Sequence, residues 1–237
     1  MLYVNKFKNS ELVHSSTRTH LKVEVLRSVH AERVLVLAPH PDDDVFGCGA
    51  LLHHLSLNKA HIKSLVFCGG SLGNNNGVRD LDLVATREKE AVSALREVGA
   101  GEANFLRYGD LKLGEHDNLW EKIYHEFQVF KPDLVLMPDG NDWNEDHVAV
   151  YSSALLAQRK IKKGKPAIWG YFVWGINRPS YLFPYNAGTK NIKMSAMACH
   201  KSQLKVKRYD EAIIGMNEYL GKGLGLEHLA EGYREIF

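Results

Sequence analysis

The sequence predicts an α/β protein with a Rossmann-like, doubly wound and mostly parallel sheet that carries helices on both faces. Short apolar runs typical of buried strands alternate along most of the chain with longer stretches in which apolar residues recur at helical spacing. In addition, clusters of ionisable residues follow two of these runs, at the points where a strand ends and a helix begins. Ligands of open α/β sheets bind at that end of the strands.

The expected elements begin after a polar lead-in, residues 1–30, which has room for one strand or helix. Strands are expected at 33–38, 62–68, 103–107, 133–137 and 167–174, and helices at 46–58, 80–98, 118–129, 147–158, 190–202 and 205–217. Residues 175–189 show no clear pattern, which favours a loop over the site. No linker or internal repeat interrupts the chain, so residues 1–237 are expected to form a single domain.

The composition is that of a globular protein with neither a nucleic acid nor a membrane as partner. Hydrophobic residues make up 45% of the chain and charged residues 24%, and the net charge of +2 includes no concentrated basic stripe. Cys48, Cys68 and Cys199 lack Cys-x-x-Cys spacing, which disfavours a disulfide framework and a structural zinc site and favours a reducing, cytoplasmic compartment. Without a signal peptide or a run of about 18 apolar residues, membrane insertion is not expected. A homo-oligomer is left open.

The most informative segment is Ala38–Cys48, which follows the apolar run Val34–Leu37 and precedes a stretch of helical spacing. It places a histidine and three consecutive aspartates within five residues. Burying unpaired charge is costly, so metal coordination is the simplest reason to gather such groups at a strand end. His40 and Asp43, three residues apart on a tight turn, can direct their side chains at one point.

A second strand end supplies a candidate for the third ligand. The predicted strand 133–137 is followed by an acidic loop that ends at His147, where the next helix begins. This loop should lie on the same rim of the sheet as His40 and Asp43. Three protein ligands with one open position describe a catalytic zinc site.

Two other interpretations fit the same residues. The three aspartates are also suited to capping the following helix and to its first turn, with His40 as an ordinary turn residue. Two histidines and one carboxylate also form the ligand set of non-haem iron oxygenases, so a 2-His-1-carboxylate iron enzyme stays open. A nucleotide-binding Rossmann enzyme is disfavoured, because the glycine-rich segment 69–77 matches neither phosphate-binding fingerprint.

Several blocks resemble the PIG-L/LmbE-like family of zinc-dependent N-acetylglucosaminyl deacetylases. The run His40-Pro41-Asp42-Asp43-Asp44, with Gly47-Cys48-Gly49, is similar to the family's H-P-D-D-E signature. Further similar blocks follow in the family's order: Thr86-Arg87-Glu88, Phe105 to Asp110, the loop ending Asp146-His147, and the late element Lys193 to Gln203. The resemblance spans roughly residues 33–205.

The resemblance implies a fold, a reaction and a set of roles. It implies removal of an N-acetyl group, by hydrolysis of a linear amide C–N bond, from an amino sugar or its conjugate, with Zn²⁺ or another divalent transition metal held by His40, Asp43 and His147. Asp42 is then the general base that acts on the metal-activated water. Among the other acids, Asp146 would orient a neighbouring residue. Arg87 and Asp110 would contact the N-acetylated sugar or glycoconjugate.

The sequence departs from the family pattern at two positions. Asp44 replaces the usual glutamate, which shortens the carboxylate without changing its charge. Asn144 replaces the first histidine of the family's H-P-D-H block, which helps to polarise the substrate carbonyl. An asparagine still donates a neutral hydrogen bond but cannot carry a positive charge or transfer a proton. A zinc-binding family member with altered or lost turnover is therefore the alternative to an active deacetylase.

Overall fold

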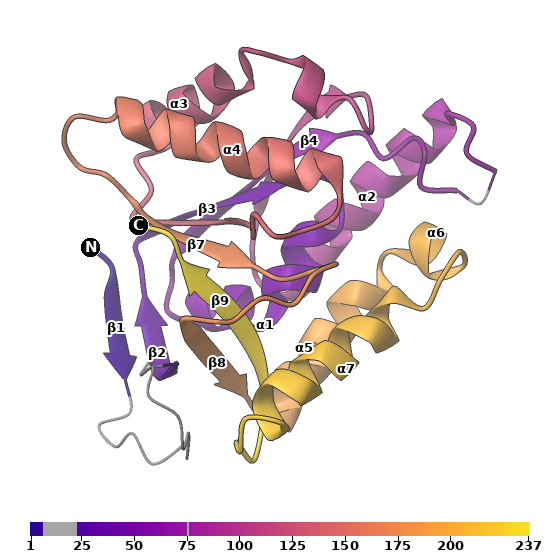
Figure 1. Ribbon diagram of the computed structural model, residues 1–237. Coiled ribbons are helices and arrows are strands. Elements are labelled where there is room, and N and C mark those ends of the chain that lie inside the picture. Colours follow the sequence, from indigo (N-terminus) through magenta and orange to yellow (C-terminus); the bar gives the residue numbers. More distant parts are fainter. Residues whose placement is uncertain (7–22, 75) are drawn as a thin grey trace.

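The computed structural model describes residues 1–6, 23–74 and 76–237 and contains one nine-stranded sheet (Figure 1). Its order is β1-β2-β8-β9-β7-β6-β3-β4-β5. The strands are β1 (Tyr3–Lys6), β2 (Glu24–His30), β3 (Arg33–Ala38), β4 (His61–Cys68), β5 (Glu102–Tyr108), β6 (Leu134–Pro138), β7 (Ala167–Tyr171), β8 (Tyr181–Tyr185) and β9 (Leu229–Glu235). The pairs β1–β2, β7–β9 and β8–β9 are antiparallel, and the other pairs are parallel.

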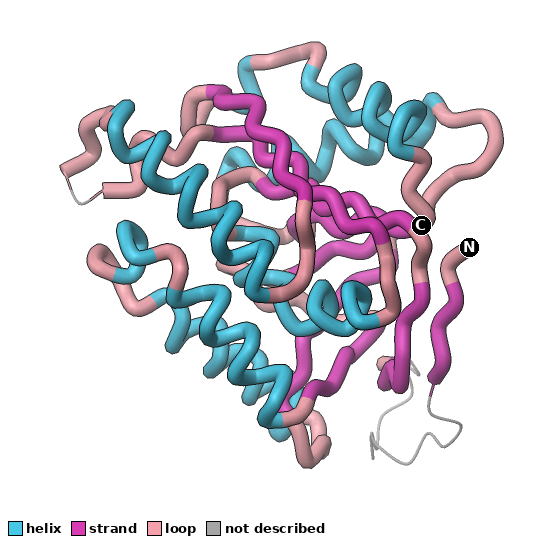
Figure 2. Tube along the Cα trace, turned by 180° about the vertical axis from the view of Figure 1, so that it is seen from behind, coloured by secondary structure: helices cyan, strands magenta, loops and turns pink. Residues whose placement is uncertain are grey.

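Helices cover both faces of the sheet, as Figures 1 and 2 show from opposite sides. They are α1 (Asp43–Leu57), α2 (Leu81–Glu97), α3 (Leu119–Phe130), α4 (Glu145–Lys160), α5 (Ala187–Ala198), α6 (Lys201–Leu204) and α7 (Tyr209–Lys222), with a 3₁₀ turn at Leu113–Glu115. The core on one face includes side chains of α1, α2, α5 and α7, and the core on the other includes those of α3 and α4. The predicted fold class, a doubly wound and mostly parallel sheet, is confirmed.

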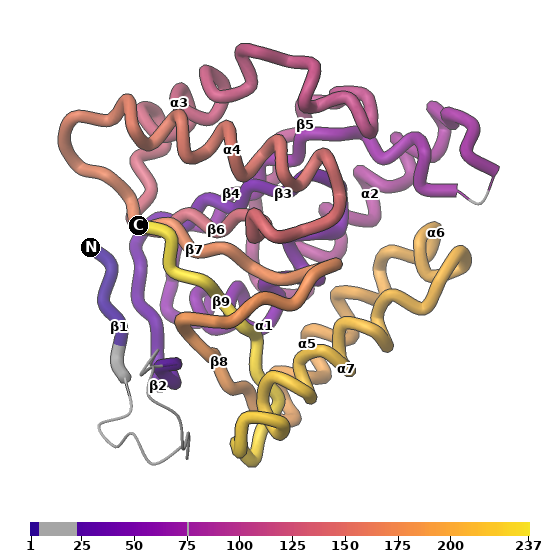
Figure 3. Tube along the Cα trace, in the orientation of Figure 1, coloured from indigo at the N-terminus to yellow at the C-terminus, as the bar shows by residue number. Residues whose placement is uncertain are grey.

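The central strands create the crevice that positions the site. From β3 the chain moves outward through β4 and β5 and then returns to pair β6 on the other side of β3 (Figure 3). The loops that leave β3 and β6 therefore diverge from neighbouring strands, which is the point where open α/β sheets bind ligands. Strand β3 can be central because both of its faces are apolar: Val34 and Val36 enter one core, and Leu35 and Leu37 enter the other.

The structure differs from the expected elements in several regions. Residues 181–185, expected within a loop, form β8, and the final strand β9 pairs antiparallel between β7 and β8. Pro184 and the short length of β8 hide the strand pattern in the sequence. The expected strand 167–174 ends earlier, at Tyr171, and part of the lead-in 1–30 joins the sheet as β1 and β2. The rest of that lead-in, residues 7–22, lies outside the described residues.

Close packing of α1 depends on the glycines of its first half. A Cβ added at Gly47 would lie 2.4 Å from a ring carbon of Tyr171, whose hydroxyl donates to the Leu37 carbonyl at 3.0 Å. Only a residue without a side chain permits this approach. The Gly-Cys-Gly sequence after the aspartates therefore brings α1 against β7, and with it the acidic start of the helix.

A buried ion pair joins β9 to α1 and α5. Lys193 Nζ lies 2.6 Å from Glu231 Oε1, and both side chains are fully buried. The Glu231 carboxylate also accepts from the backbone amides of Ala50 and Leu51, at 2.8 and 2.9 Å, and from the Tyr233 hydroxyl at 2.7 Å. Every lone pair that burial removes from water thus has a donor, which is the condition for tolerating a buried carboxylate.

Replacing Lys193 by methionine should lower the free energy of unfolding by about 3–5 kcal/mol, because Glu231 would keep its charge without the cation. The double variant Lys193→Met/Glu231→Gln should recover part of that loss, since it removes the buried charge. Urea unfolding measures both. The control is Lys222→Met, which breaks an exposed pair with Glu218 and should change stability by less than about 1 kcal/mol. Equal losses in Lys193→Met and Lys222→Met would contradict this role for the buried pair.

Candidate active site

The loops after β3 and β6 bring one histidine each to the same carboxylate. Asp43, at the first position of α1, is buried, and its Oδ2 accepts from the His40 amide at 2.9 Å. The same oxygen lies 3.2 Å from His40 Nδ1 and 3.1 Å from His147 Nε2. His147 is fully buried in the first turn of α4. The structure thus brings together the three predicted metal ligands from positions 107 residues apart in the chain.

Carboxylates hold the outer nitrogen of each imidazole. His40 Nε2 lies 3.1 Å from Asp146 Oδ2, and His147 Nδ1 lies 3.0 Å from Asp142 Oδ2. Such partners fix the tautomer and ring orientation of metal-binding histidines. An orienting role was expected for Asp146, and Asp142 is a partner that the sequence analysis missed. Its place five residues before His147, in a turn where it also accepts from the Asn144 amide, is the signal that could have identified it.

The charges of this cluster are strongly coupled. Burial disfavours protonated His147, but the adjacent Asp43 charge and the hydrogen bond with Asp142 outweigh it and raise the pKa of His147 to about 9. Burial likewise opposes ionisation of Asp43, yet the charge and hydrogen bond of His147 hold its pKa well below the usual range. Without a metal, protonated imidazole therefore supplies the positive charge beside Asp43.

The residues present fit a divalent metal ion. Asp43 Oδ1 is buried and makes no hydrogen bond within the described part of the chain, and the buried His147 Nε2 has only the Asp43 carboxylate, 3.1 Å away, as its neighbour of opposite charge. One ligand atom from each of His40, Asp43 and His147 lies within 4.8 Å of the others. Ligands of a tetrahedral zinc with bonds of about 2.0–2.2 Å are about 3.3–3.6 Å apart, slightly more than the 3.2 and 3.1 Å from Asp43 Oδ2 to the two imidazoles. A cation here would engage the Asp43 carboxylate and His147 Nε2.

A second group, His40, Cys68 and Asp110, fits a metal less well. Burial raises the pKa of the Cys68 thiol to about 11, which disfavours the thiolate that a metal needs. Both oxygens of Asp110 already accept hydrogen bonds, from the Gly70 and Leu72 amides and the Ser71 hydroxyl. We therefore assign the candidate metal site to the set that includes His147.

Asp42 and Asp44 flank the candidate ligand and serve different purposes. Asp42 is the N-cap residue of α1, but its side chain makes no capping bond and instead accepts from Arg87 Nη2 at 2.9 Å. Asp44 accepts from the Ser64 hydroxyl at 2.6 Å and the Val45 amide at 2.8 Å, which ties α1 to β4. Burial raises the pKa of Asp44 to about 6. Of the two, only Asp42 faces the cavity described below.

Asn144 combines a structural contact with a place in the site. It is the N-cap residue of α4, where its Oδ1 accepts from the Asp146 amide at 2.9 Å. This bond leaves the side-chain NH₂ group free to donate. Asn144 also lines the cavity, beside His40 and Asp42. The position that departs from the family pattern thus lines the same cavity as the predicted base.

A cavity of about 370 Å³ opens over these residues. The polar residues that line the cavity are His40, Asp42, Arg87, Asp110, Asn144, Gln203 and Lys207. Of the site residues predicted from the sequence, only Asp43, Asp146 and His147 do not line it. Trp143, Trp174 and Tyr209 form an aromatic side of the cavity. The Trp143 ring is 72% exposed but fixed, because its Nε1 donates to the Trp174 carbonyl at 3.0 Å.

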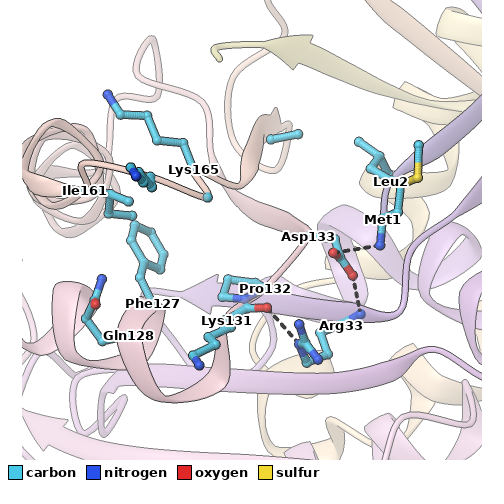
Figure 4. Close-up of a pocket in the computed structure, with 13 residues that line it drawn as sticks. Met1, Leu2, Arg33, Phe127, Gln128, Lys131, Pro132, Asp133, Ile161 and Lys165 are labelled. Carbon is cyan, nitrogen blue, oxygen red and sulfur yellow. Dashed lines mark hydrogen bonds and ion pairs between the residues drawn. The ribbon is translucent and has the colours of Figure 1, made fainter.

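A larger hollow, of about 580 Å³, lies at the opposite, amino ends of β3, β6 and β7 (Figure 4). Lys131 and Lys165 extend away from each other, and Arg33 Nε donates to the Lys131 carbonyl at 2.7 Å. Asp133 is occupied by the backbone amides of Glu32 and Arg33 and by the terminal amine. This hollow offers no set of catalytic groups comparable to the rim at the carboxyl ends.

Comparison with known proteins agrees with the sequence motifs. Residues 35–158 match the model of the PIG-L family, described as GlcNAc-PI de-N-acetylase. An uncharacterised deacetylase of Escherichia coli K12, YaiS, is 27% identical over 181 residues, which cover 71% of this chain and 90% of that protein. A probable N-acetyl-α-D-glucosaminyl L-malate deacetylase 2 of Bacillus subtilis 168 is 28% identical over 188 residues, covering 73% and 83%.

A solved structure supports the same relationship at the level of the fold. The N,N′-diacetylchitobiose deacetylase of Pyrococcus horikoshii superposes with a TM-score of 0.77 at 21% identity, covering 87% of this chain and 84% of that one. The segment matched by the family model is just over half of the 237 residues and contains both strand-end blocks. The resemblance seen in the motifs is thereby confirmed, and the chain belongs to the PIG-L family.

Proposed function

We propose that this protein is a divalent-metal-dependent hydrolase that removes the N-acetyl group from an amino sugar or its conjugate. The observation that carries the proposal is the convergence of His40, Asp43 and His147 on one point beside Asp42, at the edge of the cavity. Three ligands with an adjacent, separate carboxylate suit hydrolysis, since attack on an amide needs both an activated water and a base.

The matched proteins support the substrate class. The family model is described as a GlcNAc-PI de-N-acetylase, and the B. subtilis relative as a probable deacetylase of an N-acetylglucosaminyl malate. The P. horikoshii structure is a diacetylchitobiose deacetylase. These substrates share an N-acetylated glucosamine and differ in what is attached to it. We therefore propose an acetamido sugar as the substrate of this chain, without specifying the conjugate.

The residues of the site have distinct roles in the proposed reaction. A bound metal would polarise the acetyl carbonyl and lower the pKa of water at the site. Asp42 takes the proton from the attacking water and passes it to the departing amine nitrogen as the C–N bond breaks. Asn144 lines the cavity, and its side-chain NH₂ donates to the oxygen that gains negative charge. Asp142 and Asp146 keep the two imidazoles in place.

The aromatic side of the cavity supports a sugar as ligand. Trp143, Trp174 and Tyr209 lie in sequence along it, with ring centroids 6.1 Å apart for the tryptophans and 4.9 Å apart for Trp174 and Tyr209. Aromatic rings offer apolar faces for the C–H bonds of a pyranose, and the polar rim faces its hydroxyls. Sugar contacts by Arg87 and Asp110 stay predictions, because both side chains are engaged within the protein.

Metal binding provides the first test. Protein treated with a chelator and dialysed against Zn²⁺ should bind one equivalent, and Asp43→Ala and His147→Ala should lose this binding. His61→Ala, which removes an exposed histidine paired with Glu102, is the matched control. Elemental analysis measures all four proteins. Retention of full zinc content in His147→Ala would contradict the ligand assignment. Iron content with oxygen-dependent turnover would favour the oxygenase alternative instead.

The stabilisation by zinc should grow with pH. The pKa of His147 is raised in the folded, metal-free protein, so its contribution to stability is complete below the unfolded value of 6.5 and is lost as the pH rises through about 9. Zinc needs the neutral imidazole and must displace that proton. The zinc-dependent increase in Tm should therefore be larger at pH 9 than at pH 6.5. An increase that shrinks with rising pH would argue against His147 as a ligand.

Asp42→Asn should keep its metal and lose about 10²- to 10⁴-fold in kcat, because an amide cannot accept a proton. Asp44→Asn is the control from the same motif, since Asp44 binds Ser64 and does not line the cavity; its kcat should stay within a few-fold of wild type. Release of free amine from N-acetylglucosamine and its conjugates measures turnover. Near-normal turnover of Asp42→Asn at full metal occupancy would exclude Asp42 as the base.

Asn144→Ser should lower kcat modestly, by about 10-fold, because serine retains an acceptor for the helix cap but lacks the amide donor. Asn144→His restores the family residue and should add a titrating group to the pH–rate profile, as a histidine beside Asp146 can become charged. Both profiles are compared with wild type on one substrate. If serine matched wild type and histidine left the profile unchanged, another residue would polarise the carbonyl.

A further inference from the structure

We infer that the glycine-rich loop Gly69–Gly73 is a clamp that fixes Arg87 against Asp42, and that Arg87 is a positioning residue for this base. The inference rests on the proposed function, in which Asp42 handles the proton. The loop carries no phosphate-binding pattern, and this inference gives it a role. In this role Asp110 and Gln203 hold the loop that positions Arg87.

The ion pair of Arg87 and Asp42 is buried on both sides. Arg87 Nη2 lies 2.9 Å from Asp42 Oδ2, and the two side chains are 4% and 6% exposed. Asp42 Oδ1 makes no hydrogen bond to any residue that the structure describes, although Asp42 lines the cavity. Arg87 thus holds one carboxylate oxygen and leaves the other available to a water. This ion pair restrains rotation of the Asp42 carboxylate.

The loop encloses the guanidinium group at contact distance. Arg87 Nη1 donates to the Gly70 carbonyl at 3.2 Å. A Cβ added at Gly70, where φ is 73°, would lie 2.4 Å from Nη1, and a Cβ at Gly73 would lie equally close to the same atom. Any side chain at either position would displace the guanidinium. The glycines are therefore explained by the approach of backbone to Arg87.

Two buried side chains hold the loop in this shape. The Asp110 carboxylate accepts from the Gly70 amide at 2.8 Å, the Leu72 amide at 2.6 Å and the Ser71 hydroxyl at 3.1 Å. At the far end of the loop, Gln203 Nε2 donates to the Gly73 carbonyl at 3.0 Å. Asp110 follows β5 and Gln203 belongs to α6, so two separate elements hold the clamp.

This arrangement explains how distant residues act on Asp42. The contacts of Asp110 and Gln203 fix the conformation of the loop. The loop then fixes the position of the Arg87 guanidinium, which in turn orients the Asp42 carboxylate. Displacement of a catalytic group by about 1 Å can cost on the order of 100-fold in rate. A residue that only binds substrate would instead change KM.

The test compares kcat and KM of metal-loaded variants with a single N-acetyl sugar. Arg87→Met and Gly73→Ala should each lower kcat by about 10- to 100-fold, and Gly73→Ala, which retains the arginine, should leave KM within about threefold of wild type. Arg87→Lys keeps the charge but lacks the forked geometry of the guanidinium, so its kcat should lie between those of these variants and wild type. Arg107→Met, which breaks an exposed pair with Glu88, is the control and should match wild type. Gly73→Ala retains the arginine, so it tests the clamp even if Arg87→Met folds poorly.

A double-mutant cycle makes the test sharper. If Arg87 acts through Asp42, adding Arg87→Met to Asp42→Asn should cause little further loss of kcat. Independent losses in the double variant, or a KM at least ten times higher with kcat unchanged, would overturn the inference and return Arg87 to substrate binding. Unchanged kcat in both Arg87→Met and Gly73→Ala would also overturn it. By contrast, wild-type protein that releases no amine with any metal would overturn the proposed function itself.

Discussion

The Asp43 carboxylate is the point on which the candidate site depends. It stands at the first position of α1, it receives the His40 amide, and both imidazoles meet at its Oδ2. The loops that follow β3 and β6 are thereby held together by one carboxylate. Because the cluster is buried, a net negative charge there would be unfavourable without protons or a cation. The buried Asp43 charge brings both imidazoles to this point, and a metal ion would neutralise the same charge.

The fold contributes by deciding which strand ends are neighbours. Strands β3 and β6 are adjacent although β4 and β5 lie between them in the sequence, so their loops separate in opposite directions and leave a crevice. Gly47 lets α1 approach β7, and the buried pair of Lys193 and Glu231 secures the same helix to β9 and α5. No helix in the described ranges has both the length and the apolar composition needed to cross a bilayer.

The parts of the molecule that sequence reasoning found are those with local patterns. Buried strands such as β3 and β6 are continuous apolar runs, and the residues after them stand out because charge follows apolar sequence without a break. Strand β8, by contrast, contains Pro184, and the strands that pair with it are distant in the chain. Asp142 and the contact of Arg87 with Asp42 were missed for a related reason. A local pattern indicates which residue types are present, but not which partner across the fold each one meets.

The three consecutive aspartates illustrate how strongly the surroundings decide the role of a side chain. Asp43 and Asp44, successive residues of α1, point about 100° apart, and Asp42 precedes them as the N-cap residue, outside the helical conformation. Asp42 meets a buried guanidinium and the cavity, Asp43 meets two imidazoles, and Asp44 meets the Ser64 hydroxyl. The pKa of Asp43 is held low by its histidine neighbours, whereas burial raises that of Asp44 to about 6. One residue type in one short motif thus supplies a candidate base, a candidate ligand and a structural anchor, and only the middle position must be ionised for a metal to bind.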